Sequence, residues 1–222
     1  MISLKKYLQD PCNSLSMPYW KAKKTSLRSD TIIVHHSKFD EVLYRDWHDT
    51  KYFRVKHNLL NLTSQKLNEN FFYKTIEEEQ INDVVNVINQ SNTDFEINKN
   101  DVIHWMREET YCKDLWILIY SKRNYKYDKI KKEKIYLPVA VAISNFDPNT
   151  KEASIEWLHV IPSYRKNGLA TSLIKESLLR ISCIADFATV TSKIESQHNI
   201  YEIYQKCGFD GDAIWHVLRK NN

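Results

Sequence analysis

Six consecutive residues, Arg165-Lys166-Asn167-Gly168-Leu169-Ala170, connect a predicted strand to a predicted helix. The strand, Ile155 to Ile161, ends at Pro162, and the helix that follows carries its apolar residues at helical spacing. The first N–H groups of a helix lack intrahelical partners and lie at the positive end of its dipole, so they bind anions. A glycine there lets the backbone approach a pyrophosphate. The segment therefore predicts a phosphate-binding loop, to which Arg165 can add a charge-assisted contact.

Two other phosphate-binding motifs do not occur. The sequence has no Gly-x-Gly-x-x-Gly, which disfavours a dinucleotide fold, and no glycines placed for a Gly-Lys-Ser/Thr Walker loop. An arginine, a glycine three residues later and an alanine two further form a weak pattern when taken alone. The alternative is that Gly168 only opens a helix while Arg165 lies in solvent. The position of the loop between a strand and a helix favours phosphate binding.

The surroundings of the loop extend the pattern. Val160-Ile161-Pro162 precede it, and Asn199 with Tyr204-Gln205-Lys206-Cys207-Gly208-Phe209 follow it. Over about residues 70 to 220, the chain resembles the Gcn5-related N-acetyltransferase (GNAT) family. Ala170 stands where many members carry a second glycine, a substitution that the family commonly shows.

The resemblance implies a mixed α/β (α+β) fold, in which a mostly antiparallel, splayed sheet is flanked by helices. It also implies acetyl-coenzyme A (acetyl-CoA) as co-substrate, lodged between the strands near 155–161 and 187–194. The strand binds the pantetheine arm through its backbone and the loop cradles the pyrophosphate. The cofactor-binding residues expected on this basis are Leu158, His159, Val160, Arg165, Lys166, Asn167, Gly168, Leu169, Ala170 and Asn199.

Two side chains are candidates for catalysis. Tyr204 can donate a proton to the thiolate that leaves a thioester, with packing as the alternative role and Tyr201 as the local competitor. Glu156 can take the proton that an ammonium must lose before it attacks, or it is a strand-edge carboxylate in solvent. His159 falls opposite Glu156 if the strand alternates regularly, although a bulge would change this, and a core or surface role is favoured for it. Asn199 either caps a helix or reaches the cofactor arm.

Composition restricts the remaining possibilities. The four cysteines lie far apart and the pair His35-His36 has no ligand spacing, so we expect reduced thiols and no metal. The formal charge is +4, and seven Lys or Arg residues fall within Ser121 to Lys134. We interpret this basic segment as a solvated loop between two strands. No long apolar run or signal sequence is evident, so we expect a cytoplasmic protein.

Residues 1–65 lie outside the resemblance, and we expect an N-terminal extension or small lobe there, followed by the acetyltransferase domain at 66–222. Aromatic and apolar runs at Tyr19-Trp20, 31–34 and 52–55 predict strands in the extension. Further strands are expected at 71–73, 115–120, 139–143, 153–161, 187–194 and 213–218. Helices are expected at 76–90, 99–109, after Gly168 and at 198–206.

The function that follows is direct transfer of an acetyl group to the primary amine of a small molecule or peptide. The expected partner is this amine-bearing acceptor, with neither nucleic acid nor membrane, and a homodimer is allowed. The alternative is a non-catalytic module that binds acetyl-CoA as a sensor or scaffold. Tyr204 and Glu156 favour the enzyme, because only an enzyme needs them.

Overall fold

The computed structural model of the chain describes residues 2–91, 94–194 and 200–220. Eight strands in this part of the chain form one sheet, in the order β1-β8-β2-β7-β6-β5-β4-β3. Neighbouring strands are antiparallel except for the parallel pair β6 and β7. The strands are β1 (Thr31–His35), β2 (Trp47–His57), β3 (Phe71–Thr75), β4 (Tyr111–Asp128), β5 (Glu133–Asp147), β6 (Glu152–Val160), β7 (Phe187–Lys193) and β8 (Asp210–Lys220). This arrangement is the mixed, mostly antiparallel sheet that the sequence predicts.

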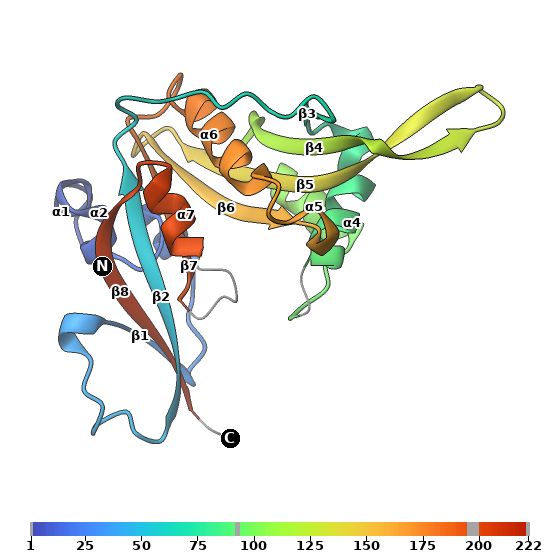
Figure 1. Cartoon of the computed structure of the whole chain (residues 1–222). Helices are drawn as coiled ribbons and strands as arrows, with labels where there is room; N and C mark the ends of the chain where they lie inside the picture. The colour runs from blue at the N-terminus through green and yellow to red at the C-terminus, as the bar shows by residue number, and fades with distance from the viewer. Residues whose placement is uncertain (1, 92–93, 195–199, 221–222) are drawn as a thin grey trace.

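Seven α-helices in the described residues flank this sheet (Figure 1). They are α1 (Leu4–Gln9), α2 (Pro11–Ser14), α3 (Tyr19–Lys24), α4 (Ile81–Ser91), α5 (Lys99–Met106), α6 (Leu169–Ile181) and α7 (Ile200–Lys206). Successive side chains of β4 point to opposite faces of the sheet, as in any β-strand. Leu118 packs in a cluster with the apolar residues of α4, whereas Ile117 and Ile119 pack with Leu169 and Leu173 of α6. None of the helices in the described residues has the length and apolarity of a membrane span.

The segment 1–65 contributes to the same sheet as residues 66–222. β2 lies between β7 and β8, pairing Val55 with Val190 on one side and Thr50 with Val217 on the other. Figure 1 shows α1 and α2 beside β2 and β8. The division of the chain into an N-terminal extension at 1–65 and an acetyltransferase domain at 66–222 stays a prediction.

A buried polar cluster fixes the N-terminal helices to the sheet. The Tyr7 hydroxyl of α1 donates to Glu152 Oε2 at 2.6 Å, and Arg54 of β2 donates to Glu152 Oε1 at 2.9 Å. Both side chains of the ion pair are fully buried. Thr189 of β7 donates to Glu152 Oε1 as well, at 2.6 Å. Four separate elements therefore meet at one carboxylate, which holds α1 against the strands that surround the candidate site.

Three expectations about individual elements are wrong. Tyr19-Trp20 begins the helix α3 rather than a strand, because both rings are buried by tertiary packing that overrides their β-propensity. The basic segment 121–134 is mostly strand, because β4 and β5 continue through it and leave only a short turn (Figure 1). The helix expected at 76–90 begins only at Ile81, because a 3₁₀ turn at Glu78–Gln80, with a capping box between Glu77 and Gln80, precedes it.

Candidate active site

The site begins where two neighbouring strands separate. β6 and β7 pair in parallel only from Glu152 with Phe187 to Ile155 with Val190. β6 continues to Val160 and β7 to Lys193. Beyond the last pair, the two strands therefore present backbone groups to an opening in the sheet. Splaying at this position agrees with the expectation from the sequence.

A cavity of about 570 Å³ lies at this opening, on the side of α6. It is bounded by the end of β6, the loop before α6, the first turn of α6 and one side of α7. Eight of the ten residues expected to bind the cofactor line it: Leu158, His159, Val160, Arg165, Lys166, Gly168, Leu169 and Ala170. The remaining wall includes Ser192 of β7 together with Ile200 and Ile203 of α7. One cavity thus gathers residues from the strand, the loop and the helix that the sequence singles out.

The first turn of α6 has the features of an anion site. Gly168 occupies the N-cap position with φ 75°, in the left-handed region that favours glycine, and makes no side-chain cap. The 13-residue helix therefore leaves its first N–H groups without a capping side chain. A Cβ built on Gly168 would approach only the amide nitrogen of Gln65, at 3.6 Å. The backbone is accessible at this point, which suits the pyrophosphate of acetyl-CoA.

The side chains of two other loop residues, Asn167 and Arg165, form hydrogen bonds with backbone carbonyls. The Asn167 amide donates to the carbonyls of Tyr164 and Arg165, both at 3.1 Å, and Asn167 does not line the cavity. Arg165 donates through Nε to the carbonyl of Val160 at 3.1 Å and through Nη2 to that of Ser91 at 2.9 Å. The guanidinium therefore ties the loop to the ends of β6 and α4. Asn199 lies outside the described residues.

His159 is a half-buried side chain at the cavity wall. Its Nδ1 lies 2.9 Å from the Ser91 hydroxyl, and its ring lies beside that of Trp157. Desolvation, aided by the nearby positive charge of Arg165, lowers the pKa of His159 to about 4. A histidine with so low a pKa is a weak base at neutral pH, in keeping with the structural role expected for it.

Glu156 is the residue at which β6 bulges. Ser144 of β5 pairs with Ile155 and Ile143 pairs with Trp157, so Glu156 has no partner on β5. A bulge re-aims side chains and interrupts the alternation of a strand. The regular alternation that would put His159 opposite Glu156 is therefore absent. Glu156 turns toward α3 instead, where its Oε2 forms an ion pair with Lys21.

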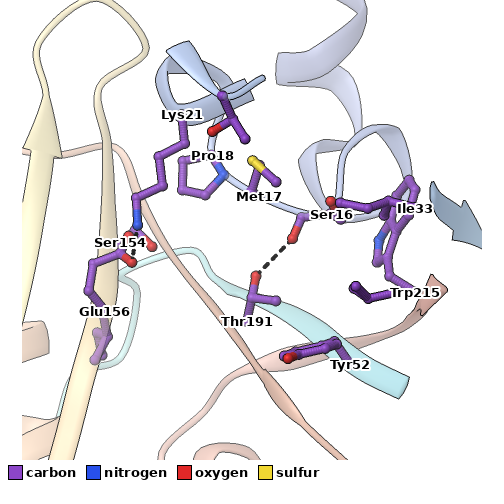
Figure 2. Close-up of a pocket in the computed structure, with 13 residues that line it drawn as sticks. Ser16, Met17, Pro18, Lys21, Ile33, Tyr52, Ser154, Glu156, Thr191 and Trp215 are labelled. Carbon is purple, nitrogen blue, oxygen red and sulfur yellow. Dashed lines mark hydrogen bonds and ion pairs between the residues drawn. The ribbon is translucent and has the colours of Figure 1, made fainter. Parts of the chain in front are cut away.

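A second cavity, of about 310 Å³, opens beside Glu156 on the side of α3 (Figure 2). Its walls are mostly apolar and come from the segment before α3 and from β1, β2 and β8. They include Met17, Pro18, Ile33, Trp215 and Val217. Figure 2 shows Lys21 reaching down from α3 toward the strand that carries Glu156. The sequence pointed to neither this cavity nor Lys21, because the ion pair joins residues 135 positions apart.

The two cavities are lined by neighbouring residues of the splayed strands. Ile155, Glu156 and Thr191 line the second cavity, and Leu158 and Ser192 line the first. The boundary falls just beyond the last β6–β7 pair.

Tyr204 lies close to this boundary between the two cavity linings, but its side chain is buried. It is 2% exposed, and its ring centroid lies 5.2 Å from that of Phe209 and 6.3 Å from that of Phe53. Burial raises the pKa of Tyr204 well above its ordinary value, so the phenol keeps its proton and can donate it. Ile203, its neighbour on α7, lines the first cavity, whereas Tyr204 does not. The competitor Tyr201 donates its hydroxyl to the carbonyl of Gly211 at 2.9 Å.

Comparison with known proteins agrees with this geometry. The sequence model described as "Acetyltransferase (GNAT) family" matches residues 94–209. Comparison with curated proteins finds no match. A GCN5-related N-acetyltransferase from Sphaerobacter thermophilus superposes with a TM-score of 0.63 at 12% identity. The match covers 86% of this chain but 59% of that protein, so the chain spans less than two-thirds of its length.

Two further solved structures share the fold. A conserved protein of unknown function from Staphylococcus epidermidis is 15% identical with a TM-score of 0.57, over 100% of this chain and 82% of its own. A chain of the NatC complex, solved with Gag peptide and CoA, is 13% identical with a TM-score of 0.51, over 68% of this chain and 99% of its own. The match to the family model, which spans more than half of the sequence, together with the splayed sheet and its loop, shows that this chain belongs to the GNAT acetyltransferase family.

Proposed function

We propose that this protein is an N-acetyltransferase, which passes the acetyl group of acetyl-CoA to a primary amine by direct attack in a ternary complex. The observation that carries the proposal is that neighbouring residues of β6 and β7, at the splay of the two strands, line both cavities. One cavity has the anion-binding loop and the other has a carboxylate. An activated acyl group and an amine can therefore be brought together without a covalent enzyme intermediate.

The loop residues would hold the co-substrate. The uncapped N–H groups at the start of α6 bind the pyrophosphate, and the unpaired stretch of β6 binds the pantetheine arm. Acetyl-CoA supplies a thioester, whose carbonyl carbon accepts the attacking nitrogen. A backbone N–H near Leu158 or Val160 stabilises the oxyanion that forms.

Two side chains would move protons. Glu156 Oε1 is buried and has no hydrogen-bond partner among the described residues, so it can accept a proton from the incoming ammonium. Tyr204, one residue from the cavity-lining Ile203, stays protonated at neutral pH and would donate a hydrogen bond or a proton to the departing thiolate. The acceptor, a small molecule or a peptide, would enter by the cavity that opens beside Met17 and Trp215, whose apolar walls favour an amine with an apolar body.

Ligand-induced stabilisation tests the binding step. A ligand at about 100 times its Kd stabilises the folded state by about 2.7 kcal/mol. In a chain of this size, that corresponds to a rise in Tm of about 5–11 °C. We expect acetyl-CoA to produce such a rise and NAD and ATP to produce none. Equal stabilisation by ATP would contradict the assignment of the loop.

Thiol release in the presence of a panel of primary amines tests the chemistry. Glu156→Gln should lower kcat by roughly 10²-fold or more with its cognate amine, because a positioned base contributes roughly 10² to 10⁴. Its affinity for acetyl-CoA should not change. Binding of acetyl-CoA without turnover of any amine would favour the sensor or scaffold instead.

A further inference from the structure

Lys21 is a primary amine that already lies against the candidate base. It is on α3, and its Nζ forms an ion pair with Glu156 Oε2 across the second cavity (Figure 2). The Lys21 side chain is 36% exposed and that of Glu156 15% exposed, so the pair lies in the wall of the cavity rather than in open solvent. An amine bound for acetyl transfer would need this same contact.

The neighbouring lysines of α3 make different contacts. Lys24 pairs with Glu109, and both side chains are well exposed, at 63% and 87%. Lys23 lies over the ring of Tyr19, 4.8 Å from its centroid. Among these three lysines only Lys21 lines the second cavity, beside Glu156 and the splay of β6 and β7. The contact with Glu156 is therefore specific to Lys21 and is not shared by the other lysines of α3.

The fixation of the N-terminal segment keeps Lys21 in place. Thr191 of β7 donates to the carbonyl of Ser16 at 3.2 Å, and Trp215 of β8 donates to that of Cys12 at 2.9 Å. Both contacts join the segment that carries α3 to strands around the opening. The amine of Lys21 is thus held close to Glu156, which replaces the encounter of a free acceptor by an intramolecular approach.

We propose that Lys21 is itself an acyl acceptor, and that the protein acetylates this residue within its own chain. This inference rests on the proposed function. Glu156 takes one proton from the Lys21 ammonium and passes it to solvent, and the nitrogen lone pair then attacks the thioester carbonyl carbon. A C–N bond forms and the C–S bond breaks. Glu156 takes the second proton of the nitrogen as the amide forms, and the thiolate is protonated by Tyr204, which then regains a proton from solvent, so the products are acetyl-lysine and free CoA.

Acetylation would also change the site. The amide of acetyl-Lys21 carries no positive charge, so the ion pair with Glu156 is lost. Glu156 would then be available to a free amine in the same cavity. The modified chain is therefore the form expected to work on an external acceptor.

The test is incubation of the purified full chain with acetyl-CoA, followed by mass spectrometry of the peptides that contain α3. We expect one acetyl group on Lys21, formed at a rate per molecule that does not depend on protein concentration. Lys21→Arg keeps a cation beside Glu156 but offers no acceptor amine, so it should abolish this acetylation. Lys24→Arg is the matched control on the same helix and should leave it unchanged. Glu156→Gln should slow it by roughly 10²-fold or more.

Three results would overturn the inference. Equal acetylation of Lys21, Lys23 and Lys24, retained in Glu156→Gln, would mean uncatalysed reaction of surface amines. A rate per molecule that rises with protein concentration would mean transfer between chains. Absence of acetyl-Lys21 from a chain that acetyl-CoA stabilises thermally would reject the inference and leave the proposed function standing, whereas absence of that stabilisation would reject both.

Discussion

The hydroxyl of Tyr7 is expected to stabilise the whole fold, although it lies on the first helix of the chain. It is the one described donor to Glu152 Oε2, at 2.6 Å, and both side chains are fully buried. Burial raises the pKa of Tyr7 above its ordinary value, so the hydroxyl keeps the proton that it donates. Tyr7→Phe keeps the ring but leaves a buried, charged oxygen without a donor.

The loss of stability expected for Tyr7→Phe follows from the contacts that remain in the variant. Arg54 Nη2, which also donates to the Tyr7 hydroxyl, keeps Glu152 Oε1 at 2.9 Å and Thr189 at 3.3 Å, so the main loss is one hydrogen bond to a charged acceptor. Such bonds are worth about 1.5–3 kcal/mol. At about 2–4 °C per kcal/mol for a chain of this size, the Tm should fall by roughly 3–12 °C.

The assay is thermal and urea unfolding of the parent, Tyr7→Phe and the control Tyr19→Phe. The Tyr19 hydroxyl makes only a long contact, 3.4 Å to the carbonyl of Ile2, so its loss should cost less than about 0.5 kcal/mol. In a Glu152→Gln background the effect of Tyr7→Phe should shrink, because the acceptor is no longer charged. A loss of stability by Tyr7→Phe no larger than that of the control would refute this account of how the N-terminal helices are held.

Three further predictions concern the site. Tyr204→Phe should lower kcat by roughly 10² to 10⁴ without changing acetyl-CoA affinity, and turnover within about threefold of the parent would make Tyr204 a packing residue. Gly168→Trp should weaken acetyl-CoA binding measured by calorimetry, at a cost in stability of about 1–2 kcal/mol for a side chain at positive φ, and unchanged affinity would place the co-substrate elsewhere. His159 has a folded-state pKa of about 4 against an ordinary 6.5, so the unfolded state binds more protons between these values and stability falls as the pH falls through them. His159→Phe should reduce the slope of unfolding free energy in that window by up to about 1.4 kcal/mol per pH unit, and an unchanged slope would show that His159 is not its source.

Local sequence signals predicted the elements that form the cavity beside α6. The strand that ends before Pro162, the glycine and the amphipathic stripe of the next helix are all short-range features, and β6 and α6 follow them closely. The apolar runs at 115–120 and 139–143 likewise mark the buried parts of β4 and β5. A pattern of this kind is predictable because its cause lies within a few residues.

The features that were missed depend on contacts between distant residues. Tyr19 and Trp20 have high β-propensity, but packing on Tyr7, whose ring lies 5.3 Å from that of Tyr19, decides their conformation. The ion pair of Lys21 with Glu156 follows from the bulge in β6 and from the docking of α3, and neither has a local signal. The extension of β4 and β5 through the basic segment depends on pairing such as that of Tyr125 with Tyr136, which charge content does not reveal.

The place of β2 in the sheet has a consequence for how the chain folds. Residues 47–57 are synthesised more than 100 residues before either of their partners, at 188–193 and 210–220. Closing such long loops is slow, because their entropy is lost before the contacts form. β2 therefore has neither neighbour until residues 188–193 have been made, and one of its edges stays unpaired until β8 has left the ribosome. The central part of the sheet can be completed only after residue 220 has been made, so the nascent chain exposes an aggregation-prone edge until then.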